Sequence, residues 1–282
     1  MMKMYTGVVV LSVSSEIVNQ LFKDKKIQIQ EEWKQLNTFC ENQFVVAKAG
    51  SSQSAVCRVK GADLYLIEKV RVSGLEPRNK EQMMALNVLA DDKVTVVVLT
   101  GKAGTGKTLL TLAAAIQKMD DGVYDKIILT KPMSQVGKYD LGALPGEVED
   151  KFMPYLENYL CNFTAFMPNT SIEDLIARYN IEFVPLQLIR GASWAKSFII
   201  ADEVQTLDYH EMLTLGTRTG EGSKIVIMGD LNQRDEDIPK EKTGIYKLVN
   251  SSKSKDSKLV ASIELLKCER SETAMLFTDI FE

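Results

Sequence analysis

The first residues that could do chemistry form a glycine-rich stretch. It runs from Gly101 to Thr108, reads GKAGTGKT and matches the spacing G-x-x-x-x-G-K-[ST]. Glycines at these positions allow successive backbone N–H groups to turn inward around an anion, because no Cβ atom obstructs the turn. The lysine would reach the outer oxygens of a polyphosphate, and the hydroxyl that follows it would bind Mg²⁺. The spacing therefore predicts a phosphate-binding loop in which Lys107 holds phosphate and Thr108 holds the metal.

The segments on either side of this loop have the patterns of a strand and a helix, which would hold the loop in position. A β-branched run from Val94 predicts a buried strand before it, and the leucine- and alanine-rich run after Thr108 predicts a helix. The start of that helix adds its dipole to the anion site. The alternative is a glycine-rich turn with an incidental lysine, which would not require a strand before the loop and a helix after it. The nucleotide-binding residues are expected to be Gly101, Lys102, Ala103, Gly104, Thr105, Gly106, Lys107, Thr108 and Leu109.

A second chemical pattern lies about a hundred residues further on, where the apolar run FIIA ends in Asp202 and Glu203. Parallel α/β sheets place their ligand sites at the carboxyl ends of the strands, so both carboxylates are expected there. Asp202 would hold Mg²⁺, and Glu203 could accept a proton from an attacking water. An apolar run ending in Asp-Glu is common by itself, so this assignment depends on the phosphate loop upstream.

A third pattern, MGDLNQ, follows the strand expected at 223–228. An amide at this strand end would lie beside the γ-phosphate, so Gln233 is a candidate reporter of that phosphate. The alternative is a short turn without a role in chemistry.

The bulk composition excludes several classes of protein. The 282 residues are 45% hydrophobic and 26% charged, as in ordinary globular domains, and no apolar run is long enough to span a bilayer. The formal net charge of −4 argues against coating of nucleic acid by the whole surface but leaves a local basic groove open. The four cysteines lack C-x-x-C spacing and there is one histidine, so we expect neither zinc nor disulfides. A reduced cytoplasm is the expected compartment.

Two regions of the chain differ in pattern. Residues 1–74 contain short β-rich runs separated by glycine turns, which predict a small β-rich N-terminal module. We expect this module to pack against the main domain rather than to recognise a ligand independently. Residues 75–282 alternate between strand and helix patterns, which predicts an α/β domain with a mostly parallel sheet flanked by helices. Further strands are expected at 5–13, 26–30, 44–47, 55–59, 64–70, 126–130, 181–186 and 259–266, and helices at 16–22, 77–89, 148–163, 171–179 and 271–281.

The helix at 77–89 contains Gln82, upstream of the phosphate loop. A glutamine amide offers a donor and an acceptor, which can pair with N6 and N7 of adenine. The alternative is a solvated amphipathic face.

Together, GKAGTGKT, the loop from Lys131-Pro132 to Leu144-Pro145-Gly146, FIIADEVQ and MGDLNQ resemble the PhoH family of ATPases. The resemblance covers about residues 41–282. It implies a RecA-like P-loop NTPase core related to superfamily 1 helicases, with ATP and Mg²⁺ as cofactors. The runs at 42–46, 77–82 and 269–271 look most like the subgroup that is fused behind a PIN-type ribonuclease domain.

The resemblance also implies roles for individual residues. Gln82 matches the glutamine that reads adenine, and Thr108 and Asp202 match the metal ligands. Asp202, Glu203 and Gln205 match an Asp-Glu-x-Gln motif, and Gln233 matches the sensor of the γ-phosphate. Arg270 falls where helicases place an arginine against the transferring phosphate. The implied catalytic residues are Lys107, Glu203, Gln205, Gln233 and Arg270.

The chain departs from the family pattern at two places. Lys131 stands where arginine is usual, which keeps the charge but loses the bidentate guanidinium. The stretch before Glu41 is too short for a PIN domain and lacks a cluster of acids able to hold catalytic metals. We therefore expect no ribonuclease activity from this chain.

These patterns predict Mg²⁺-dependent ATP binding and hydrolysis, coupled to the binding or unwinding of single-stranded RNA. The alternative is a nucleotide-gated, oligomeric adaptor that remodels a protein partner without nucleic acid, or a slow ATPase whose bound state is itself the signal. Superfamily 1 helicases have two RecA-like domains, whereas this chain has room for one. Neighbouring subunits are therefore expected to complete the site within a ring, with Arg270, Arg218 or Arg190 donated in trans, and the resemblance to the PhoH family implies that the ring is a hexamer. The alternative is a monomer whose arginines make surface ion pairs.

Overall fold

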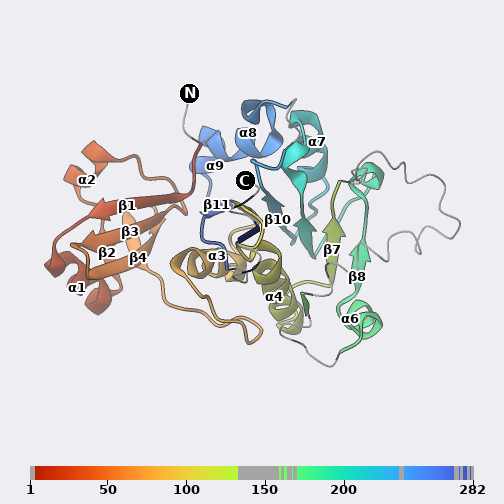
Figure 1. Ribbon diagram of the computed structural model, residues 1–282, viewed down its shortest axis with the longest axis horizontal. Coiled ribbons are helices and arrows are strands. Elements are labelled where there is room, and N and C mark those ends of the chain that lie inside the picture. Colours follow the sequence, from red (N-terminus) through yellow and green to blue (C-terminus); the bar gives the residue numbers. More distant parts are fainter. Residues whose placement is uncertain are drawn as a thin grey trace, which may run out of the picture.

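A computed structural model of the 282-residue chain describes residues 4–132, 159, 162, 163, 167, 170–234, 238–269, 273, 276, 277 and 280. The helices expected at 148–163 and 271–281 fall mostly outside the described residues. Figure 1 shows an elongated molecule with one β-sheet at the N-terminal end and a second sheet in the middle. Within the described part, no helix combines the length and apolar character needed to cross a membrane.

The N-terminal sheet has five strands in the order β1-β3-β4-β5-β2. The first two pair in parallel and the others antiparallel. Side chains alternate along its strands, so Val45 faces the helices before it and Phe44 and Val46 face the rest of the chain. The strands are β1 (Val8–Ser12), β2 (Lys26–Gln28), β3 (Phe44–Ala49), β4 (Gln53–Lys60) and β5 (Asp63–Leu66), and the helices beside them are α1 (Ser15–Asp24) and α2 (Glu31–Leu36).

The central sheet has six parallel strands in the order β11-β6-β10-β9-β7-β8. This confirms the α/β class and the parallel sheet, and it places every strand's carboxyl end at the same edge. Its strands are β6 (Val96–Gly101), β7 (Lys126–Thr130), β8 (Ile181–Phe183), β9 (Ser197–Ala201), β10 (Lys224–Gly229) and β11 (Val260–Leu265).

Helices cover both faces of the central sheet (Figure 1). One face packs against α3 (Lys80–Ala90) and α4 (Lys107–Asp120), and the other against α7 (Tyr209–Gly216) and α8 (Gly244–Asn250). Each buried strand supplies side chains to both faces, which explains its nearly continuous apolar sequence. The remaining elements are α6 (Ile172–Tyr179), α9 (Ser252–Lys255) and the short 3₁₀ turns η2 (Leu186–Leu188), η3 (Val204–Thr206) and η4 (Lys240–Lys242).

Several elements begin or end away from their expected positions for local reasons. The helix expected from residue 77 begins at Lys80, because the Asn79 side chain accepts a hydrogen bond from Gln82 N and caps it there. The strand expected at 181–186 ends at Phe183, since Pro185 lacks an N–H and is the N-cap of η2. The short helix α2 was not expected, because the buried Trp33 is its one strong apolar anchor. Ser171 caps the start of α6, since its hydroxyl accepts a hydrogen bond from Asp174 N at 3.1 Å.

Helix α3 is buried between the two sheets. Met84, Ala85, Leu86, Val88 and Leu89 are each at most 1% exposed. They belong to one apolar core that includes residues of β3 and β4 on one side and of β6 and β10 on the other. The N-terminal module therefore packs on the main domain through a shared core, as expected. The division of the chain at residue 74 stays a prediction.

Polar groups from both sheets hold the carboxyl end of α3. The buried Arg58 of β4 donates to Asp91 Oδ2 at 2.9 Å and to Asn87 Oδ1 at 3.2 Å. It also donates to Asn42 Oδ1, and Asn42 Nδ2 donates to Val260 O of β11 at 2.9 Å. Burial lowers the pKa of Arg58, and the Asp91 carboxylate opposes that shift. The module is thus joined to α3 and to the central sheet.

Lys224, the first residue of β10, caps the same end of the helix. Its side chain is fully buried, and its ammonium donates to Val88 O at 3.1 Å, Leu89 O at 2.7 Å and Asp91 O at 2.9 Å. Burial lowers the pKa of Lys224 to about 7. Each ammonium proton nevertheless has a carbonyl acceptor, and the carboxyl end of the helix dipole favours a cation.

We predict that Lys224→Met lowers the free energy of unfolding by about 2–4 kcal/mol, because three buried carbonyls lose their donor. Denaturant titration would measure the change, with Lys253→Met as a control at an exposed lysine. Equal stability of the two variants would contradict a capping role for Lys224.

Candidate nucleotide-binding site

The phosphate loop joins β6 to α4 at the carboxyl edge of the central sheet. Gly101 and Gly106 have φ angles of +142° and +94°, values that L side chains rarely adopt. A Cβ on Gly101 would lie 2.1 Å from Leu265 O of the adjacent β11, and one on Gly106 would lie 3.1 Å from the Gln82 side chain. The glycine spacing is therefore required by the backbone and by its neighbours.

Two side chains of the loop bond back onto its own backbone. The Lys107 ammonium donates to Gly101 O at 2.6 Å and to Lys102 O at 3.0 Å. The fully buried Thr105 donates from its hydroxyl to Lys102 O at 2.9 Å. The loop is thus held in one shape, with the cation of Lys107 against the residues that would surround phosphate.

Asp202, immediately after β9, lies beside the start of α4. Its Oδ2 accepts from the Thr108 hydroxyl at 3.3 Å, and its Oδ1 accepts from Glu203 N at 2.9 Å. The glycine-rich loop follows β6 and Asp202 follows β9, and one strand, β10, lies between these two strands in the sheet. Burial raises the pKa of the Asp202 carboxyl, and the Glu203 carboxylate adds to that rise. A nearby cation would favour its charged form.

Glu203 and Gln205 form a second pair at this edge. Glu203 has a φ of +55°, an uncommon conformation for a non-glycine residue that is typical of strained functional positions. Gln205 Nε2 donates to the Glu203 carboxylate at 2.9 Å, and Gln205 Oε1 accepts from Asp230 N at 3.4 Å. Gln205 thereby orients Glu203 and connects it to the turn after β10.

Tyr159 also reaches this site, and sequence reasoning did not identify it. It is 5% exposed, and its hydroxyl is buried without a well-formed hydrogen bond among the described residues. Burial raises the pKa of Tyr159, and the charges of Asp202 and Glu203 add to the shift. No local pattern distinguishes this tyrosine, which comes from the stretch expected to be an amphipathic helix at 148–163.

These residues fit a magnesium ion. Mg²⁺ prefers hard oxygen ligands and is bound through one or two carboxylates while it keeps several waters. Thr108 and Asp202 offer a hydroxyl and a carboxylate within 3.3 Å of each other. The buried Tyr159 hydroxyl lies beside Asp202 and adds a further polar oxygen to this group.

At the other end of the loop, Gln82 contacts the loop backbone. Its Nε2 donates to Thr105 O at 3.1 Å, and its Oε1 accepts from Arg78 N at 2.9 Å. An amide keeps one further donor hydrogen and one further lone pair in this arrangement, as an adenine contact requires. Gln82 is 5% exposed, so it also packs the loop rather than forming a solvated face.

The segment after β11 closes on the same region. Glu269 N donates to Gly104 O at 2.9 Å, and the Glu269 carboxylate accepts from Asn79 Nδ2 at 3.0 Å. Asn79 and Lys267 together lower the pKa of Glu269. The beginning of α3 and the segment that follows β11 are thereby tied to the phosphate loop.

Some candidate residues lie further from these contacts. Gln233 is exposed in the turn after β10, and Lys131 follows β7 at the same edge of the sheet. Arg190 is exposed and lines a groove of about 560 Å³ with Pro132 and His210.

Arg218 lies at the opposite, amino-terminal edge of the sheet, in the segment between α7 and β10, where its carbonyl accepts a hydrogen bond from Trp194 N. Its guanidinium donates to Ala192 O at 3.1 Å, so this side chain is far from the site of its own chain. Arg270, Lys138 and the loop at 135–146 lie outside the described residues.

A glycine loop between a parallel strand and a helix, with a carboxylate at the end of a parallel strand that is separated from it by one further strand, defines a P-loop α/β protein. The comparisons with known proteins agree with this class. The sequence profile of the family described as PhoH-like protein matches residues 74–282, and the chain belongs to that family.

Two relatives illustrate how far the similarity extends. Protein PhoH2 of Bacillus subtilis is 38% identical over 99% of this chain, and Protein PhoH2 of Mycolicibacterium smegmatis is 32% identical over 99%. The similarity thus includes the N-terminal module, beyond the limit of about residue 41 that the motifs suggested. The chain spans 64% and 63% of the lengths of these two relatives.

Among solved structures, the SWI2/SNF2 ATPase core of Sulfolobus solfataricus, in complex with dsDNA, has a TM-score of 0.40 and 15% identity to this chain. That match covers 68% of this chain and 39% of the other.

Proposed function

We propose that this chain binds ATP with Mg²⁺ and hydrolyses it. The observation that carries the proposal is the contact of Thr108 with Asp202 at 3.3 Å beside the Glu203–Gln205 pair. A candidate metal-binding pair, a candidate base and a residue that could orient this base lie together beside the glycine-rich loop. Membership of the PhoH-like family supports the same activity.

Each residue has a distinct part in this proposal. Lys107 neutralises charge at the β- and γ-phosphates, and Thr108 and Asp202 would hold Mg²⁺. The ion, when bound, supplies positive charge at the phosphate oxygens. Glu203, held by Gln205, orients the attacking water and accepts its proton. Gln233, in the turn that Gln205 contacts through Asp230, senses the γ-phosphate, and Gln82 reads adenine.

We expect Glu203→Gln to bind ATP normally but to lower kcat by about 100-fold or more, because the water loses its base. Lys107→Ala should instead weaken ATP binding and abolish turnover. Phosphate release and nucleotide titration would measure both, with Glu221→Gln as a control at an exposed glutamate. Turnover by Glu203→Gln at the parent rate would contradict the assignment of the base.

We infer that turnover is coupled to single-stranded RNA. Lys131 lies at the edge of the sheet that holds Asp202, and the loop at 135–146 with Lys138 follows it in sequence. The formal charge of −4 favours such a local contact over general attraction. Unwinding of RNA is the stronger form of this proposal, and remodelling of a protein partner is the alternative.

We predict that single-stranded RNA stimulates ATP turnover and that its binding weakens steeply with salt, since phosphate contacts release counterions. Lys131→Glu should weaken binding, whereas Lys93→Glu, at an exposed lysine, should not. Fluorescence anisotropy at two salt concentrations, with and without a nonhydrolysable ATP analogue, measures this. Absence of binding in all conditions would favour the adaptor.

We also propose that the subunits form a closed ring, most simply a hexamer, in which a neighbour's arginine completes the site. The ties of Glu269 to Gly104 and Asn79 support a role for Arg270, the next residue in sequence. Arg218, bound to Ala192 O at the opposite edge, could act only across an interface. Exposed Arg190 is the third candidate.

Mixing Arg270→Ala subunits with Lys107→Ala subunits should restore activity if the arginine acts in trans, because one mixed interface then holds both wild-type residues. Each variant alone is the control. A strictly monomeric mass by light scattering, with and without ATP, would contradict the ring.

The compartment that we propose is the cytoplasm. Cys40, Cys57 and Cys268 are free thiols, and burial raises the pKa of Cys57 to about 12. An inert, reduced thiol of this kind is compatible with a reducing environment.

A further inference from the structure

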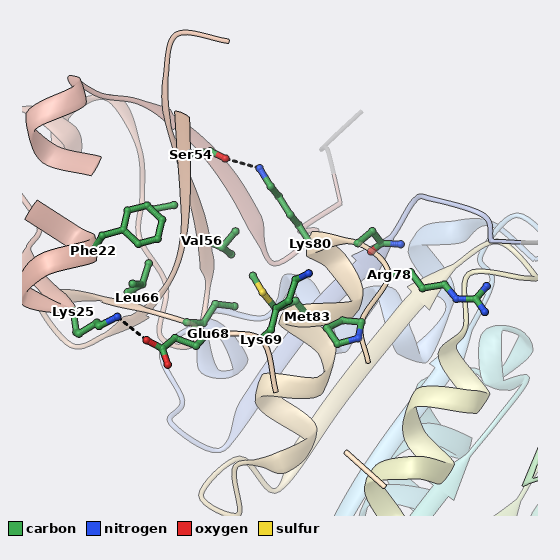
Figure 2. Close-up of a pocket in the computed structure, with 14 residues that line it drawn as sticks. Phe22, Lys25, Ser54, Val56, Leu66, Glu68, Lys69, Arg78, Lys80 and Met83 are labelled. Atoms are coloured by element: carbon green, nitrogen blue, oxygen red, sulfur yellow. Dashed lines mark hydrogen bonds and ion pairs between the residues drawn. The ribbon is translucent and has the colours of Figure 1, made fainter. Parts of the chain in front are cut away.

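A cavity of about 490 Å³ lies between the N-terminal module and the beginning of α3. Figure 2 shows that its walls come from α1 and from the strands of the N-terminal sheet on one side, and from the start of α3 on the other. Its size falls within the range of about 300–1,000 Å³ that is typical of small-molecule sites. The fold therefore contains a second concave site beside the nucleotide-binding element.

The cavity has an apolar end next to α1. Phe22 is 53% exposed, although aromatic side chains of this size are usually more buried. Its ring lies near Leu66, and Val56 and Met83 continue the apolar wall toward α3 (Figure 2). A half-exposed aromatic ring over an apolar wall is suited to stacking with a flat, apolar group.

Lysines lie at both ends of the cavity, with Lys25 beside Phe22 and with Lys69 and Lys80 toward the start of α3, whereas the Arg78 guanidinium points away from the other lining side chains (Figure 2). Four of its fourteen lining residues are basic and one is acidic. The acid, Glu68, is bound to Lys25 at 2.6 Å, and Lys80 donates to the Ser54 hydroxyl at 2.6 Å. Lys69 is exposed and makes no ion pair with a described residue. The net charge of the lining, together with the positive end of α3, favours an anion near Lys69 and Lys80.

This cavity is distinct from the ATP site. No residue of the phosphate loop lines it, and the Gln82 amide points instead to Thr105 O. The two sites share the short segment before α3, because Asn79 lines the cavity and also donates to Glu269, which contacts Gly104. A ligand bound in the cavity would therefore contact Asn79, and through Asn79 and Glu269 it could shift the phosphate loop of the proposed ATP site.

We propose that the cavity binds a nucleoside phosphate, either as a free nucleotide or as one residue of a single strand. The base stacks on Phe22 and Leu66, and the phosphate lies between Lys69 and Lys80. Glu68 accepts hydrogen bonds from ribose hydroxyls or a base amino group. Because Asn79 is common to both sites, occupancy changes the affinity for ATP, and ATP changes the affinity for the occupant by the same factor.

The test measures calorimetric binding of AMP and of UMP to the full chain, with Mg²⁺ and a saturating nonhydrolysable ATP analogue to block the phosphate loop. Saturable binding is expected. Lys69→Glu should weaken it about tenfold or more, since a charged hydrogen bond becomes a repulsion. Phe22→Ala should weaken it about 5- to 100-fold through lost stacking. Lys23→Glu is the matched control, because it makes the same charge change at an exposed position next to Phe22 but outside the cavity.

A six-residue oligouridine separates the two sources of the ligand. If the oligomer alone binds and Lys69→Glu weakens it, the occupant is a residue of a strand. Saturable binding of neither mononucleotide nor oligomer would overturn the inference, as would equal losses from Lys69→Glu and Lys23→Glu. Oligomer binding that is lost in Lys131→Glu but kept in Lys69→Glu would overturn the cavity assignment while leaving the proposed RNA contact intact.

Discussion

The burial of α3 between two sheets is the constraint on which the rest of the molecule depends. Its apolar residues pack against the N-terminal sheet on one side and the central sheet on the other, so neither sheet can move without exposing part of a shared core. The two ends of the helix have different partners. Arg58 and Lys224 hold its carboxyl end, and Asn79 and Gln82 place its amino end against the phosphate loop. A single helix thereby fixes the position of the N-terminal module relative to one wall of the candidate nucleotide site.

The chemistry of the site follows from a parallel sheet. All six strands of that sheet end at one edge, so residues about a hundred positions apart in sequence meet there. The strained backbone of Glu203 can persist because β9 and the buried Gln205 hold it on both sides. Burial of Asp202 makes an uncompensated charge costly, so a nearby cation would stabilise the charged form of this carboxylate.

Charge is distributed unevenly in this acidic chain. The formal charge of −4 would repel polyanions from the surface as a whole. Cations are nevertheless gathered at two places joined by the start of α3, namely the phosphate loop with Lys107 and the cavity with Lys69 and Lys80. In both places a lysine lies near the amino terminus of a helix, and the positive charge of the lysine and of the helix N–H groups attracts phosphate.

The sequence by itself determined the parts of this protein that depend on local pattern. The phosphate loop, the carboxylates after β9, the parallel sheet and the family could all be inferred, since glycine spacing and apolar runs act over a few residues. The boundaries of elements were predicted less well. The Asn79 cap makes α3 begin later than expected, and Pro185 makes β8 end earlier than expected. Only the tertiary structure decided that Tyr159 lies beside Asp202, that Lys224 caps α3 and that a basic cavity adjoins α1. Each of these depends on side chains from separate elements, and their proximity arises from packing in three dimensions rather than from any spacing along the chain.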